Sequence, residues 1–237
     1  MTTVIRHIIA PVLLAAACWG LPAAASAQDA TALVQQVRAR LEKVNDYEAT
    51  GVMKTDVSFL KVPAAEVKVY FRRPDKLKIK NEKGVSLVPK GSVSISLNNL
   101  LSGKYQVIDG GAGQLNGVGV RIVKLLPLDE NGEVVLSTLY IDPARLLILK
   151  AKTTTRESGT NELEMSYGKY AAWALPDKVV FSFNAQEYKL PKGVTFDYDD
   201  GSAKKKPASG SESQRGKIEI TYASYIINKG VPDAVFK

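Results

Sequence analysis

The chain has 237 residues, a formal net charge of +8 and 24% charged residues, but only one cysteine, Cys18, and one histidine, His7. Both lie in the first 27 residues, so a mature chain without that segment has no disulfide, cysteine nucleophile, Ser-His-Asp triad or His/Cys zinc site. Catalysis would then rely on carboxylates, lysines, tyrosines or hydroxyls, and we expect a protein that is not an enzyme and needs no metal or cofactor.

Residues 1–27 predict a cleaved secretory signal peptide. A short cationic start precedes an apolar stretch, and Ala25, Ser26 and Ala27 form a small-residue cleavage signal. The apolar stretch is shorter than the roughly 20 residues of a membrane span, and no later stretch is apolar enough to cross a bilayer. We therefore expect an exported, periplasmic protein. Because Leu14 to Cys18 loosely resembles a bacterial lipobox, a lipid anchor through Cys18 is the alternative.

Residues 28–237 are long enough for one domain with a substantial core, and we expect a single, monomeric domain. A pI near 9.4 permits contact with anionic lipid or nucleic acid. The basic residues, however, are mostly interspersed with acids, which is typical of a solvated face. Only Lys204 to Lys206 form a run, and no aromatic residue interleaves with it, so the pattern does not favour nucleic acid.

The first element after the signal segment is an expected amphipathic helix. Asp29 is its candidate N-cap, and an apolar stripe follows at spacings of four, four and three residues. The stripe consists of Leu33, Val37, Leu41 and Val44. We expect Asn45 and Asp46 to end this helix and its stripe to cover another element.

From Tyr47 onward the pattern changes to that of strands. Val67, Val69 and Phe71 alternate with Lys68, Tyr70 and Arg72, so the two sets occupy opposite faces of one strand. Leu77 and Ile79, and then Ile95 and Leu97, repeat this alternation. Further strands are expected within residues 119–125, 133–141, 146–155, 163–170, 177–183 and 218–227. Turn-length gaps between them indicate an antiparallel meander.

Two segments interrupt the strand pattern. Residues 98–103, with the glycines at 110, 111 and 113, predict a brief helix or loop, and residues 200–217 predict a mobile loop. A sheet of so many strands closes, or curls and has its apolar face covered. We therefore expect a mainly β protein with few helices (α+β), in which a curved antiparallel sheet forms an incomplete β-barrel covered by the N-terminal helix and a short lid.

LVQQVRARLEKVNDYEATGVMKT followed by VKVYFRRPDKLKIK resembles the start of proteins in the LolA/LolB superfamily of periplasmic lipoprotein carriers. The matching positions are Leu41, Val44, Tyr47 and the Arg73-Pro74 strand end. Weaker similarities downstream extend to the wider group that includes the RseB and MucB sensors. The resemblance covers most of residues 28–237 as a succession of elements, but only the Arg-Pro strand end is motif-like.

This resemblance implies an incomplete barrel whose concave apolar face accepts acyl chains of a lipoprotein or another lipid. It also implies that Arg73 hydrogen-bonds to a lid and holds the empty form closed, and that an inner-membrane donor and an outer-membrane acceptor are partners. The implied function is a periplasmic carrier or chaperone. A sensor module that binds a lipid or protein signal is the alternative.

The candidate acyl-binding residues are the inward-facing apolar residues of the helix and first strands, and a filled core is the alternative for each of them. They are Leu33, Val37, Leu41, Tyr47, Val67, Val69, Phe71, Leu77, Ile79, Ile95 and Leu97. Strand parity places Arg73 on their side, as a latch or a strand-end residue that reaches solvent, and Arg72 on the solvated side. The acidic pairs are interpreted as turn residues, and DYDDG lacks the spacing of a calcium loop.

Overall fold

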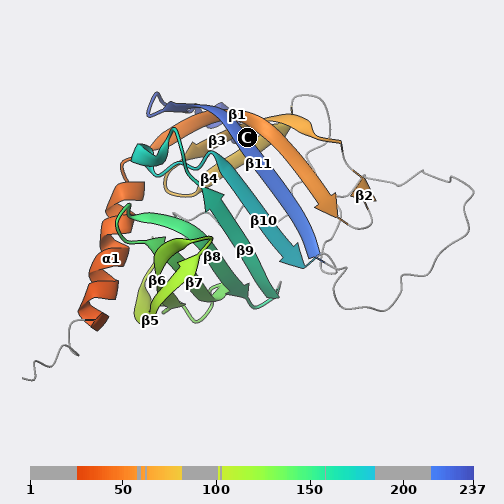
Figure 1. Cartoon of the computed structure of the whole chain (residues 1–237). Helices are drawn as coiled ribbons and strands as arrows, with labels where there is room; N and C mark the ends of the chain where they lie inside the picture. Colours follow the sequence, from red (N-terminus) through yellow and green to blue (C-terminus); the bar gives the residue numbers. More distant parts are fainter. Residues whose placement is uncertain are drawn as a thin grey trace, which may run out of the picture.

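The computed structural model describes residues 26–57, 60–61, 63–81, 101, 103–157, 159–184 and 215–237. One α-helix, α1 (Ser26–Leu41), is followed by strands that form one sheet (Figure 1). The strands are β1 (Asp46–Val57), β2 (Leu60–Lys61), β3 (Ala65–Arg72), β4 (Lys76–Asn81), β5 (Tyr105–Leu115), β6 (Val118–Pro127), β7 (Val134–Asp142), β8 (Leu147–Thr155), β9 (Gly159–Ser166), β10 (Lys178–Asn184) and β11 (Arg215–Ile227). Two 3₁₀ turns, η1 (Ala171–Trp173) and η3 (Asp233–Val235), complete the described elements.

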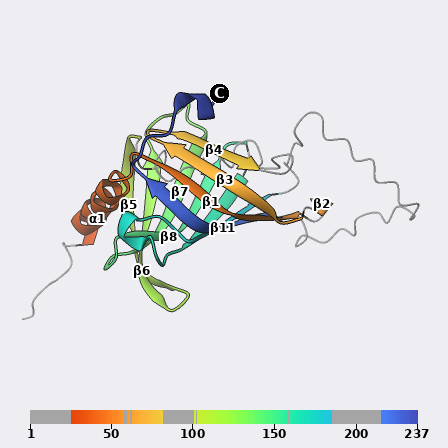
Figure 2. The ribbon, with the colours of Figure 1, turned by 90° about the horizontal axis from the view of Figure 1, so that it is seen from above.

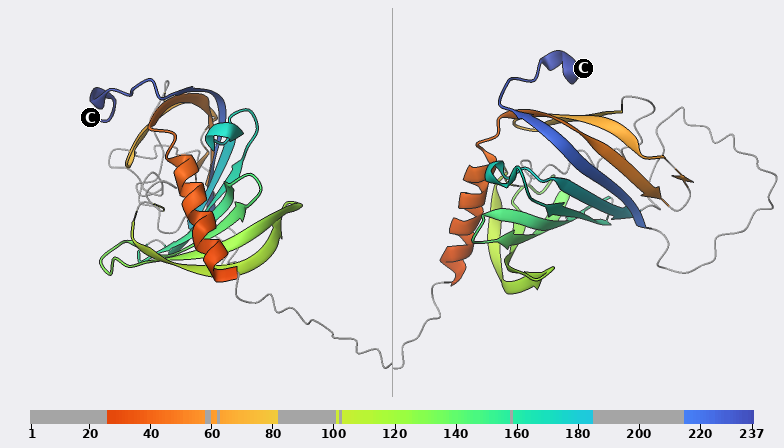
Figure 3. Two further views of the ribbon diagram at one scale, coloured as in Figure 1. Left: turned by 90° about the vertical axis from the view of Figure 1, so that its left-hand side faces the viewer. Right: turned by 45° about the horizontal axis from the view of Figure 1, so that its top comes forward.

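The sheet runs in the order β4-β3-β1-β11-β10-β9-β8-β7-β6-β5, with β2 paired to β1, and its strand pairs are antiparallel. Figure 2 shows β4, β3, β1 and β11 side by side. In this order β4 and β5 are the two edges, so the sheet is open and curved around its inner face (Figure 3). The prediction of a curved, incomplete antiparallel barrel with an N-terminal helix is confirmed.

The long pair of β1 and β11 joins the beginning and the end of the described chain. Their register shifts between Thr50 and Gly51, where a β-bulge lies. A Cβ atom on Gly51 would lie 2.5 Å from the carbonyl oxygen of Thr221, which is backbone and cannot move aside. Glycine therefore permits the close approach of these two strands at the bulge.

Helix α1 differs in detail from the helix expected from the sequence. It begins at Ser26, so Asp29 lies inside it and is not its cap, and it ends at Leu41. Its buried residues are Ala30, Leu33, Val34 and Val37, whereas Leu41 is half-buried and Val44 lies beyond the helix. The stripe is thus displaced toward the N-terminus, because the chain leaves the helix before reaching Val44.

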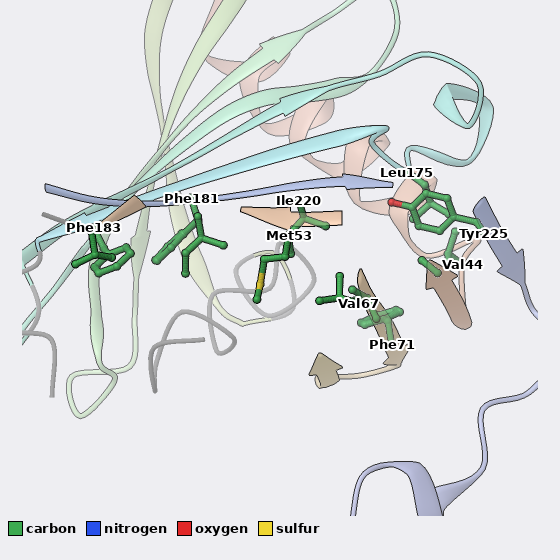
Figure 4. Close-up of a cluster of buried hydrophobic side chains, with 13 residues drawn as sticks. Val44, Met53, Val67, Phe71, Leu175, Phe181, Phe183, Ile220 and Tyr225 are labelled. Atoms are coloured by element: carbon green, nitrogen blue, oxygen red, sulfur yellow. The ribbon is translucent and has the colours of Figure 1, made fainter. Parts of the chain in front are cut away.

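Two apolar clusters lie on the inner face of the sheet. We call the first the helix core, because α1 contributes to it: Ala30, Leu33, Val34, Val37, Leu101, Val123, Leu125, Leu139, Ile141, Ile148, Ala151 and Met165. We call the second the strand core, shown in Figure 4: Val44, Ala49, Met53, Val57, Val67, Val69, Phe71, Leu175, Phe181, Phe183, Ile218, Ile220 and Tyr225. Helix α1 therefore packs over the strands from β5 to β9 and contributes no buried residue to the strand core.

The two expected interruptions also need correction. The glycines at 110, 111 and 113 lie within β5, where a bulge between Asp109 and Ala112 absorbs the irregularity and Gly111 adopts a φ of +85°. The Asp109 carboxylate accepts a hydrogen bond from the Gly111 N–H at 2.8 Å, and this bond lowers the pKa of Asp109. Residues 215–217 belong to β11, so the predicted loop ends earlier than expected. The remainder of that loop, and most of residues 98–103, lie outside the described residues.

Candidate functional site

The strand core is a layer of buried apolar side chains on the inner face of β1, β3, β10 and β11, each at most 9% exposed. Antiparallel register places Phe71 opposite Tyr47, Val69 opposite Ala49 and Val67 opposite Gly51. On the other side of β3, Leu77 lies opposite Phe71 and Ile79 opposite Val69. Tyr47, Val67, Val69, Phe71, Leu77 and Ile79, all predicted as candidate binding residues, therefore share this surface.

The other predicted residues are not brought to this surface. Leu33 and Val37 are buried in the helix core, and Leu41 packs at its margin. Their partners lie on strands β5 to β9, so the helix residues and the β3 residues belong to different clusters. Ile95 and Leu97 lie outside the described residues.

Sequence reasoning missed several residues that complete the strand core. Met53 extends from β1, Phe181 and Phe183 from β10, and Ile220 from β11 (Figure 4). Ile218 of β11 belongs to the same cluster. The phenylalanine rings stack with their centroids 5.5 Å apart. The alternation in residues 177–183 and 218–227 predicted both strands, but local alternation cannot show that β11 returns to lie between β10 and β1.

Tyrosine rings form one end of the strand core. Tyr47 stacks on Phe71 at 5.2 Å between centroids and meets Tyr225 edge-on at 5.3 Å. Tyr225 also contacts Tyr170 at 4.9 Å and Tyr222 at 5.0 Å. Stacked and edge-on pairs of this kind add stability beyond their buried area.

This end of the surface is uncharged at physiological pH. Burial raises the pKa of Tyr47, Tyr222 and Tyr225 well above that of a free tyrosine, so all three phenols stay protonated. The Tyr225 hydroxyl donates a hydrogen bond to the carbonyl of Pro176 at 2.7 Å. Since the other buried members of the strand core are hydrocarbon or thioether side chains, the surface suits a ligand that needs burial and no charge partner.

Arg73 ties the turn after β3 to the chain just beyond α1. Its backbone N–H donates to the carbonyl of Asn45 at 2.9 Å, and its Nη1 donates to the carbonyl of Glu42 at 2.9 Å. Its Nη2 also lies 3.5 Å from the Glu42 carboxylate. The guanidinium is therefore paired and does not extend into solvent alone, although β3 itself ends one residue earlier, at Arg72.

Two further side chains fix the same end of α1. Arg40 donates to the carbonyl of Arg145 at 2.7 Å and to that of Ala171 at 2.9 Å. The Asn228 amide donates to the carbonyl of Lys43 at 2.9 Å. The C-terminal end of α1 is thus attached to the β7–β8 turn, to η1 and to the segment after β11.

Arg72 does not behave as the solvated strand residue expected from parity. Its Nη1 donates to the carbonyl of Val231 at 3.0 Å, its Nη2 pairs with the Asp233 carboxylate, and its guanidinium lies 5.4 Å from the centre of the Phe236 ring. Arg72 and Lys76 together lower the pKa of Asp233 to about 2. Parity does separate the two arginines: Arg73 binds the segment after α1, and Arg72 binds the segment after β11.

We expect Arg73→Leu and Arg72→Leu to loosen different parts of the molecule. Loss of the Arg73 bonds should accelerate amide hydrogen exchange in residues 42–46, whereas loss of the Arg72 bonds should accelerate it in residues 231–236. Hydrogen-exchange mass spectrometry of both variants measures this directly. The same exchange pattern in the two variants would contradict these separate roles.

Several solved protein structures are similar to this chain in fold. A candidate outer membrane lipoprotein-sorting protein domain from Vibrio parahaemolyticus matches with a TM-score of 0.58 over 89% of this chain and 97% of that chain, at 12% identity. A LolA superfamily protein from Nitrosomonas europaea matches with a TM-score of 0.53 over 86% of this chain and 97% of that chain, at 10% identity. The chain has the LolA-like fold.

A DUF1329 family protein from Desulfovibrio piger shares the LolA-like fold with a TM-score of 0.58, at 12% identity over 90% of this chain and 97% of that chain. No family model and no curated sequence matches the chain. A MucB structure matches with a TM-score of only 0.28, which carries no argument for the sensor alternative. Within the described residues of this LolA-like chain, no helix is long and apolar enough to cross a membrane.

Proposed function

We propose that the strand core binds the acyl chains of a lipid or lipoprotein and that the protein is a non-enzymatic carrier of such a ligand in the periplasm. The observation that supports this proposal is an uncharged, aromatic-rich inner surface of a LolA-like sheet to which α1 contributes no buried residue. Acyl chains suit such a surface, because burial of each methylene contributes about 0.8 kcal/mol without any directed polar contact.

Exchange of the ligand need not displace α1. The helix buries Leu33, Val34 and Val37 against the helix core, and exposure of each would cost about 1.5 to 3 kcal/mol. Arg73, Arg40 and Asn228 also hold its C-terminal end. We therefore propose that α1 stays in place during ligand exchange and that Arg73 positions it, instead of latching a moving lid.

Native mass spectrometry of protein purified from a bacterial periplasm tests the carrier function. We expect lipid to co-purify, and the delipidated protein to bind a fluorescent fatty acid in a saturable manner. Absence of both bound lipid and fatty-acid binding, under conditions that retain acyl ligands, would argue against the proposal. Recovery of a specific signalling partner without any transfer of lipoprotein to an acceptor would favour the sensor alternative.

A further inference from the structure

A short row of buried polar side chains crosses the inner face of β7, β8 and β9. Ser137 lies opposite Thr153, and Thr153 lies opposite Asn161. Leu139 and Ala151 of the helix core stand two residues away on β7 and β8, so the row points to the same inner face. Ser137 and Thr153 are each 1% exposed, and Asn161 is 7% exposed. We call Ser137, Thr153 and Asn161 the polar row.

The polar row makes few hydrogen bonds with the protein. The hydroxyl oxygens of Ser137 and Thr153 lie 3.4 Å apart, which is longer than a typical O–H···O bond of about 2.7 to 2.8 Å. Within the described residues, no hydrogen bond engages the Asn161 side chain, although its amide can both donate and accept. A buried amide without partners destabilises a folded protein. The row therefore has hydrogen-bonding capacity that the described residues do not use.

The polar row adjoins the phenylalanine end of the strand core. Ser182 pairs with Glu162, so the same register places Phe183 beside Asn161 on the inner face. Figure 4 shows Phe183 at one end of the strand core and Tyr225 at the other. An acyl chain that covers the strand core can therefore bring its polar end to the row.

A second polar group without a partner lies at this end of the sheet. Thr55 on β1 and Phe181 on β10 both pair with Ile218 of β11, one from each side. The Thr55 hydroxyl is buried and has no hydrogen-bond partner in the part of the chain that the structure describes. Unused polar groups thus lie on both sides of the two phenylalanines.

The side chains around the polar row favour a neutral ligand group. On the inner face of the described strands, the nearest neighbours of the row are uncharged: Leu125, Leu139, Ala151, Thr155, Leu163 and Phe183. A carboxylate or a phosphate at this place would be buried without a counter-ion, which is costly. A neutral carbonyl oxygen, by contrast, accepts hydrogen bonds from hydroxyl and amide donors and needs no compensating charge.

We propose that the polar row holds the ester or amide linkage of an acylated ligand whose chain covers the strand core. The inference rests on the proposed carrier function and narrows its ligand class to esterified or amidated acyl chains. The Asn161 amide donates a hydrogen bond to the carbonyl oxygen of the linkage, and the row hydroxyls complete the site. The ligand thus compensates a buried amide that has no partner in the ligand-free protein.

Fluorescence titration with two matched probes tests this proposal. The probes are the methyl ester of a pyrene-labelled fatty acid and the pyrene-labelled alkane of the same chain length. Asn161→Leu should lower the affinity of the delipidated protein for the methyl ester about tenfold, which corresponds to one hydrogen bond between neutral groups. The affinity for the alkane should stay the same or rise.

Two further variants support the comparison. Thr153→Val removes only a hydroxyl from the polar row and should also weaken binding of the methyl ester selectively. Asn131→Leu makes the same exchange as Asn161→Leu at an exposed position between β6 and β7, and it should change neither affinity.

Thermal unfolding distinguishes a binding group from a structural one. Asn161→Leu should raise the melting temperature of the ligand-free protein by about 3 °C, because the buried amide has no partner to lose. A lower melting temperature would identify the amide as structural and overturn the inference.

The titrations separate failure of this inference from failure of the carrier function. If Asn161→Leu leaves the affinity for the methyl ester unchanged, or weakens both probes equally, the inference falls and the carrier function stands. Tighter binding of the wild type to the free carboxylate than to its methyl ester would also overturn the inference alone. If the wild type binds neither probe nor the fatty acid, the carrier function falls and this inference falls with it.

Discussion

Replacing Met53 with glutamate should lower the affinity for a fluorescent fatty acid by about a hundredfold and should also lower the free energy of unfolding, because an ionised carboxylate among buried apolar side chains costs several kcal/mol. Met53 is only 3% exposed and lies in the strand core, where it faces Ile220 across β1 and β11. A fluorescence titration of the delipidated protein measures the change.

The neighbouring residue supplies a matched control for this variant. Val52 is 41% exposed and points to the other face of β1, so Val52→Glu adds the same charge without entering the strand core. Its affinity should stay near that of the wild type, and Met53→Leu should also retain binding. A folded Met53→Glu protein, verified by circular dichroism, that binds the fatty acid normally would show that the ligand lies elsewhere.

Leu139→Ala should lower the free energy of unfolding by about 3 kcal/mol, which is the typical cost of truncating a fully buried leucine. Leu139 is 0% exposed in the helix core, between Val123 on β6 and Ala151 on β8. The surrounding sheet cannot close the resulting cavity without shifting both neighbouring strands. Urea denaturation followed by circular dichroism gives the difference from the wild type.

Leu128→Ala is the control, because Leu128 is 61% exposed and its truncation should change the free energy of unfolding by less than about 0.5 kcal/mol. Fatty-acid affinity adds a second measurement. Since Leu139 belongs to the helix core, Leu139→Ala should still bind the ligand at temperatures where it is folded. Equal stability of the two leucine variants would contradict the assignment of Leu139 to a tightly packed core.

Local alternation was sufficient to predict much of the sheet. In β3 the buried residues alternate with partly exposed ones, as pleat geometry requires. Val67, Val69 and Phe71 are buried, and Lys68, Tyr70 and Arg72 are partly exposed. The same signal failed in β5, because glycines normally indicate turns and here they accommodate a bulge within a strand. It also extended the helical stripe to Val44, since spacing alone does not reveal where a helix stops.

The partners of the candidate site depend on contacts between distant parts of the chain. Arg72 binds Val231 and Asp233, which lie about 160 residues away, and no local pattern marks them as partners. In the same way, β11 pairs with β1, so residues near the C-terminus complete the strand core. Six of the residues predicted to face inward thus lie together in the strand core, whereas its β10 and β11 half was not predicted, and the binding role of the six stays a prediction.

Periodicity and composition were enough to establish strands, an N-terminal amphipathic helix and an inward-facing apolar set, because the side-chain geometry of each element repeats every two or 3.6 residues. Packing alone separated that set into a helix core and a strand core. The reason is physical: α1 buries its stripe on whichever strands the sheet curvature brings beneath it, and curvature arises from the pairing of all the strands together.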